Sequence, residues 1–138
     1  MMNTGRGRHH SRADAGQSLV EMAIAIVLFV SLTFGIVDAG RLIFAYNLVS
    51  SGAREGVRWA AVRGGTSGRT ATAADVTSYV RSVTVGTPVN VTATWAPDNQ
   101  PGSTVAVTVQ TDFAPIAPFP GVPRDLNLSS TSTMVISR

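Results

Sequence analysis

Hydrophobic residues follow three different patterns along the chain, and each pattern is typical of a different element. From residue 19 to residue 37 nearly every position is apolar, and Glu21 is the only charged residue in the run. At 1.5 Å per residue, a helix over this run is about 28 Å long, close to the ~30 Å hydrocarbon thickness of a bilayer. The first pattern therefore predicts a transmembrane helix over about residues 19–37.

The second pattern follows directly and has a helical period. At about 100° per residue, one face of a continued helix is small and apolar. It comprises Leu42, Tyr46, Val49, Ala53, Gly56 and Ala60. The opposite face is polar and comprises Asn47, Ser51, Arg54 and Arg58. We expect one long helix over residues 17–63, with a membrane-spanning first half and an amphipathic second half, ended by Gly64-Gly65.

The third pattern fills residues 64–138, which we expect to form an α+β domain outside the cytoplasm. A short helix is predicted at about 72–82. Alternating apolar and polar residues, separated by turn residues, then predict strands at about 89–96, 103–112 and 126–137. Three antiparallel strands need a cover for their apolar face, and the amphipathic helix supplies one. The predicted fold class is α+β, a long N-terminal helix packed on a small antiparallel sheet of about three strands.

Small residues recur at a spacing of four along the predicted helix. Gly35 and Ala39 form one such pair, and Gly52 and Gly56 form another. This spacing permits close helix packing, although glycine and alanine are also frequent in this composition.

The composition argues against an enzyme and against a metal or cofactor site. The chain has no cysteine, and its two histidines, His9 and His10, are adjacent in the N-terminal leader. The acidic residues after Glu21 are scattered singly, and no glycine-rich phosphate loop is present. All eleven basic residues are arginines, without the repeats and interleaved aromatics of a nucleic-acid-binding tract. We therefore expect no catalytic residues, small-molecule substrate or nucleic-acid partner.

Charge flanking the apolar run bears on orientation and processing. Three arginines precede it within the leader, and Arg41 and Arg54 follow, which favours a cytoplasmic N-terminus. A basic leader before an apolar stretch also describes a secretory signal, with small residues that permit cleavage after Ala39. The apolar run is slightly longer than such signals usually have, and both interpretations remain open at this point.

Four segments in order resemble the TadE-like family. They are Gly16-Gln17-Ser18-Leu19-Val20-Glu21, the apolar run, residues 35–41 (GIVDAGR) and residues 51–56 (SGAREG). Members of this family are pilin-like minor proteins of the bacterial tight-adherence (Flp) pilus machinery. The resemblance covers about residues 16–63, and it implies a pilin-like fold.

The resemblance also implies specific roles. Residues 1–16 would be a basic leader, removed after Gly16 by a prepilin peptidase, so that Gln17 becomes the new N-terminus. Glu21 would then neutralise the α-amine of a neighbouring pilin or pseudopilin, which lowers the cost of placing both charges in lipid. Major Flp pilins usually carry tyrosine after this glutamate. Met22 stands here, and with the sizeable outer domain it favours a minor pseudopilin that works with the inner-membrane assembly platform. TadF- and TadG-like roles remain open.

Three functions are thus consistent with the sequence. The first is a processed, membrane-anchored pseudopilin in pilus assembly and secretion. The second is a single-span membrane protein whose outer domain binds a ligand, without leader removal. The third is a soluble secreted protein cut after Ala39. They differ in the mature N-terminus.

Overall fold

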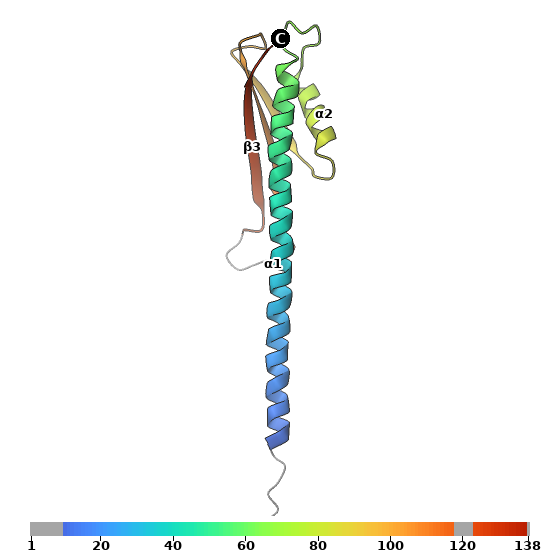
Figure 1. The fold of residues 1–138 in the computed structure, drawn as a ribbon, viewed down its shortest axis with the longest axis vertical. Helices are drawn as coiled ribbons and strands as arrows, with labels where there is room; N and C mark the ends of the chain where they lie inside the picture. The colour runs from blue at the N-terminus through green and yellow to red at the C-terminus, as the bar shows by residue number, and fades with distance from the viewer. Residues whose placement is uncertain (1–9, 118–122, 138) are drawn as a thin grey trace, which may run out of the picture. The chain divides into compact units, whose positions relative to one another are not determined.

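The computed structural model describes residues 10–117 and 123–137, with side chains described from Gly16 onward within those ranges. Residues 1–9 of the expected leader lie outside the described residues. The elements are α1 (His10–Ala61), α2 (Ala73–Val83), β1 (Asn90–Ala96), β2 (Thr104–Phe113) and β3 (Leu126–Val135), as Figure 1 shows. The predicted α+β fold class, a long N-terminal helix packed on three antiparallel strands, is confirmed.

The chain divides into two compact units, Met1–Val37 and Asp38–Arg138. In the first unit, the large apolar side chains of α1 are exposed, among them Leu19 at 71% and Phe29 at 70%. By length and composition, the described part of α1, Gly16–Ala61, can cross a membrane. The exposed apolar surface of the first unit matches lipid as its surroundings.

The second unit is built on an antiparallel sheet in the order β1-β2-β3. The central strand β2 pairs with both neighbours, and Val107 lies opposite Ala93 on one side and Ser132 on the other. Every second residue of the central strand, from Val105 to Phe113, is buried. This period-two burial follows from the pleat, which points alternate side chains to the same face of the sheet.

The second half of α1 covers this face together with α2 (Figure 1). Val49, Ala53 and Val57 of α1 belong to the same buried cluster as Val76 and Val80 of α2 and the β2 valines. Small residues on α1 allow the three layers to approach closely. The division between the two units therefore places the second half of α1 inside the globular domain rather than before it.

The buried face of α1 is rotated from the predicted one at its beginning. Tyr46, expected on the apolar face, is 56% exposed, whereas Ala45 is buried. Val57, about 20° from Tyr46 around the helix, is buried, so this side of α1 is covered further along the helix but not at Tyr46. The helix expected over 17–63 begins before residue 17 and ends at Ala61, two residues earlier than expected.

Candidate functional site

The residues assigned to leader cleavage and assembly all lie on the exposed surface of α1. Gly16, Gln17 and Glu21 are exposed. Among the residues whose side chains the structure describes, none forms a hydrogen bond or an ion pair with the Glu21 carboxylate. A Cβ atom added at Gly16 would meet nothing within 4 Å. The fold of this chain therefore gives no packing reason for glycine at position 16.

The two small-residue pairs lie in different surroundings. Ala39 is exposed and Gly35 is partly exposed on α1. Gly52 and Gly56 are buried, and a Cβ at Gly52 would lie 2.8 Å from Thr84 Cγ2. At Gly56 the added Cβ would lie 2.6 Å from Val80 Cγ2. Close helix packing at Gly52 and Gly56 is thus made with α2 of the same chain.

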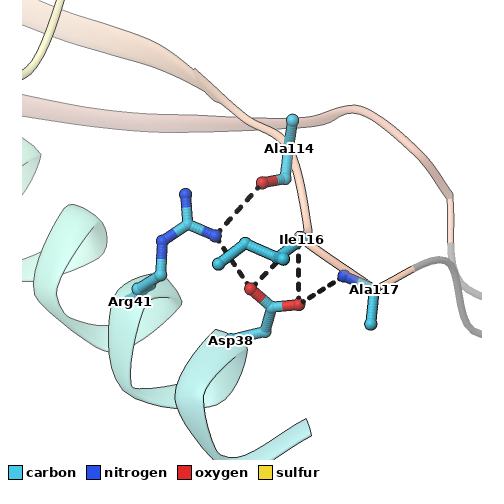
Figure 2. A network of polar contacts seen from close by, with 5 residues as sticks. All are labelled: Asp38, Arg41, Ala114, Ile116 and Ala117. Atoms are coloured by element: carbon cyan, nitrogen blue, oxygen red, sulfur yellow. Dashed lines mark hydrogen bonds and ion pairs between the residues drawn. The ribbon is translucent and has the colours of Figure 1, made fainter. Parts of the chain in front are cut away.

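A polar cluster forms where the globular unit begins, around the Asp38 carboxylate (Figure 2). Two backbone N–H groups from the segment after β2 donate to it. Ile116 donates to Oδ2 at 2.9 Å and to Oδ1 at 3.1 Å, and Ala117 donates to Oδ2 at 3.1 Å. Arg41, one turn further along α1, donates from Nη1 to Oδ1 at 2.8 Å. The carboxylate therefore has three donor groups, two of which come from a distant part of the chain.

Arg41 joins the same segment in two further ways. Its Nη1 lies 3.5 Å from the carbonyl oxygen of Ala114, and its guanidinium lies 5.2 Å from the centre of the Phe113 ring. Asp38 itself is only 7% exposed. A buried carboxylate needs donors to offset the loss of hydration, and here the backbone of residues 116–117 and the arginine provide them. Asp38 thus ties the end of β2 to α1.

A second polar cluster connects α1 to α2. The Tyr79 hydroxyl donates to Glu55 Oε1 at 2.9 Å, and its ring stacks on Trp59 at a centroid distance of 5.2 Å. The Arg63 guanidinium lies 4.1 Å from the centre of the Trp59 ring. The hydrogen bond to Glu55 raises the pKa of the Tyr79 phenol, and burial adds to this rise. Trp59 and Glu55 of α1 therefore both contact Tyr79 of α2 and link the two helices.

Comparison with known proteins gives a match that covers most of α1. The model of the TadE-like protein family matches residues 16–58. These residues form a TadE-like segment. The match begins at Gly16 and ends within the last turn of α1, so the TadE-like segment includes Glu21, Asp38 and Gly56. The resemblance drawn from the sequence is confirmed for this segment. No curated protein and no solved structure matches the chain.

The role of Asp38 was not predicted from the sequence. Spacing alone indicates a pair between Asp38 and Arg41, which the structure contains at 2.8 Å. The backbone donors lie 78 and 79 residues further along the chain, and no local pattern marks them. The available signal was an aspartate directly after a transmembrane-grade run, because a carboxylate at such a boundary needs partners.

Proposed function

We propose that this chain is a membrane-anchored minor pseudopilin that contributes to tight-adherence pilus biogenesis and has no enzymatic role. A prepilin peptidase cuts it after Gly16, and α1 then anchors it in the cytoplasmic membrane, with the N-terminus inside and the globular unit outside. Glu21 pairs with the α-amine of a neighbouring pilin or pseudopilin. The family match to residues 16–58 supports the connection to pilus assembly.

The observation that carries the proposal is that Glu21 is exposed and has no partner among the described residues. Its carboxylate is exposed on an apolar helix, and no described residue of the chain pairs with it. On insertion scales an unpaired charge costs about 2.5–3.5 kcal/mol at a helix centre and a smaller amount near the start of the apolar run, where Glu21 lies. A cationic partner from another subunit removes part of that cost, and the new α-amine at Gln17 provides such a cation.

Gly16 provides the sharpest test of processing. Because open space surrounds this position, a Gly16→Leu substitution leaves the fold of the chain unaffected. We expect wild-type protein coexpressed with a prepilin peptidase to begin at Gln17 and Gly16→Leu protein to keep its leader, as read by N-terminal sequencing. Gly40→Leu is the matched control, since its Cβ also meets nothing within 4 Å, and it should be processed normally. Cleavage of the Gly16→Leu chain at the same bond would contradict the proposal.

Glu21 is tested separately from processing. In the pilus-producing host, Glu21→Ala should insert in the membrane at least as well as wild type but enter pilus assemblies poorly. Ser18→Ala, an exposed polar change one turn earlier, should assemble normally. Wild-type levels of assembled Glu21→Ala protein would remove the role proposed for the carboxylate.

The secreted alternative is weakened by the Asp38 cluster. Cleavage after Ala39 would separate Asp38 from the globular unit and leave the N–H groups of Ile116 and Ala117 without their acceptor. The ligand-binding alternative predicts an intact leader, so the N-terminal sequence of the native protein distinguishes it.

A further inference from the structure

A group of large apolar residues just beyond Val37 is exposed at one end of the globular unit, in addition to single ones elsewhere such as Val85 and Val135. On α1, Ile43 is 62% exposed, Phe44 is 63% exposed and Tyr46 is 56% exposed. Ile116, in the segment after β2, is 55% exposed. Large apolar side chains in this number at one end of a domain need a non-aqueous partner.

Their directions around α1 indicate what kind of partner this is. At about 100° per residue, Tyr46, Ile43 and Phe44 point about 80°, 140° and 240° away from Asp38. They therefore span an arc of about 160° on the sides of α1 away from Asp38. A protein partner would cover these sides alone, whereas lipid would also contact the remaining sides of the helix.

On the remaining side of α1, Asp38 and Arg41 would form an exposed charged patch if nothing covered them. There the segment after β2 lies against α1 and gives its two N–H groups to the Asp38 carboxylate (Figure 2). The same segment carries the exposed Ile116 side chain. The cluster thus covers a charged patch and adds an apolar residue on the side where α1 has none.

The exposed residues of α1 change from apolar to polar after Tyr46. From Asn47 onward, the exposed positions of the helix up to Arg58 are polar, among them Ser51 and Arg54. The helical rise from residue 19 to residue 46 is about 42 Å, which matches the ~40–45 Å of a bilayer including its headgroups. Tyrosine, with an apolar ring and a polar tip, is enriched at this depth.

We propose that residues 38–46 and 114–117 form a collar that seats the globular unit in the headgroup layer of the membrane. Asp38 is its positioning residue, because it holds the segment that brings Ile116 to the lipid. The collar depends on the membrane anchoring of the proposed function but not on leader cleavage or pilus assembly. Failure of either of those would leave it intact.

Labelled variants of the full chain in lipid vesicles test the collar. The sequence has no cysteine, so a single introduced cysteine carries one environment-sensitive fluorophore. The variants are Ile116→Cys and Phe44→Cys in the collar, with Thr92→Cys on β1 and Ser51→Cys on α1 as exposed controls. Vesicles of phosphatidylethanolamine and phosphatidylglycerol contain lipids with a nitroxide quencher near the headgroup.

We expect lipid-borne quenching and blue-shifted emission at positions 116 and 44, and neither at positions 92 and 51. Adding Asp38→Ala, which removes both acceptor oxygens, should abolish the quenching at position 116 while leaving that at position 44. Circular dichroism checks that this variant keeps its sheet, and the comparison of the single-label variants does not depend on it.

Two results would overturn the collar. One is a label at position 116, in the otherwise wild-type chain, that shows neither lipid-borne quenching nor a blue shift and is therefore fully exposed to water. The other is a label that is shielded from water but insensitive to lipid quencher, which would mean that a protein, such as a second copy, covers the site. Persistent quenching at position 116 in the folded Asp38→Ala chain would remove the positioning role of Asp38.

Discussion

The two halves of α1 are both rich in apolar residues, yet they use them in opposite ways. Before Val37 the helix carries large side chains, such as Phe29 and Leu32, that are 65–70% exposed. After Asp38 its inward face carries small ones, such as Ala53 and Ala60, that are fully buried. Large exposed side chains suit a fluid partner that needs no fixed shape. Small buried ones suit a fixed partner at close range.

This difference implies different tolerance to substitution. In the first half, any side chain of sufficient hydrophobicity serves, because lipid rearranges around it. In the second half, shape matters as much as hydrophobicity, because α2 and the sheet occupy fixed positions. Four predictions test this contrast between the membrane-grade half and the packed domain in the full-length protein, the first through both membrane insertion and domain stability and the others mainly through domain stability.

The largest effect is expected from a buried charge. Val107→Asp places an unpaired carboxylate at a position with no exposed surface, and should cost about 3–5 kcal/mol of unfolding free energy. Val27→Asp, at a position 64% exposed, should leave the domain stable and weaken insertion by about 2.5–3.5 kcal/mol. Urea unfolding in detergent, followed by tryptophan fluorescence, reports on the domain, since Trp59 and Trp95 pack against its core. Carbonate extraction of membranes reports on insertion.

If both variants lost both properties, membrane insertion and domain stability would not be separable. We expect Val107→Asp protein to stay in the membrane fraction with an unfolded domain, and Val27→Asp protein to show the reverse.

The next effect concerns shape rather than charge. Gly56→Ala introduces a methyl group 2.6 Å from Val80 Cγ2 and 3.1 Å from Val107 Cγ1, and these stiff side chains cannot easily move away. Overpacking of this kind costs about 1–3 kcal/mol, although alanine is the better helix former. Gly40→Ala, with open space around its Cβ, should instead be neutral or stabilising by up to about 1 kcal/mol. Urea midpoints of the two variants would differ in sign, and equal shifts would contradict the packing argument.

Local patterns predicted the elements well, because the helical period of 3.6 residues and the strand period of 2 residues can be recognised from residues close together in the sequence. The three strands and both helices lie where the periodicity places them. The sequence did not reveal which residues meet across long separations. Asp38 binds a backbone 78 residues away, and Tyr79 binds Glu55, 24 residues away. The exposure of Tyr46 was missed because no local pattern marks where the cover over α1 begins.

A smaller effect is expected at the start of α2, where Thr72 caps the helix. Its hydroxyl accepts a hydrogen bond from the Asp75 N–H at 3.2 Å, and the Asp75 carboxylate accepts one from the Thr72 N–H at 3.0 Å. Thr72→Ala should lower domain stability by about 1 kcal/mol, measured as a urea midpoint, without changing membrane insertion. Ser78→Ala, an exposed change within the same helix, should have little effect. An equal loss in both variants would mean that the cap contributes nothing specific.

The smallest effect is the pH dependence of the same cap. The hydrogen bond from the Thr72 hydroxyl, joined by that from its backbone N–H, lowers the pKa of Asp75. A carboxyl whose pKa is lower in the folded state stabilises the fold above its unfolded pKa of about 3.9, and the stabilisation disappears as pH falls through the folded value. Wild-type chain should therefore be slightly more stable than Asp75→Asn at pH 6, with the difference shrinking by pH 3. Because other carboxylates titrate equally in both proteins, the difference between their urea midpoints isolates Asp75. A difference that stayed constant with pH would show that the charge of Asp75 plays no part in capping α2.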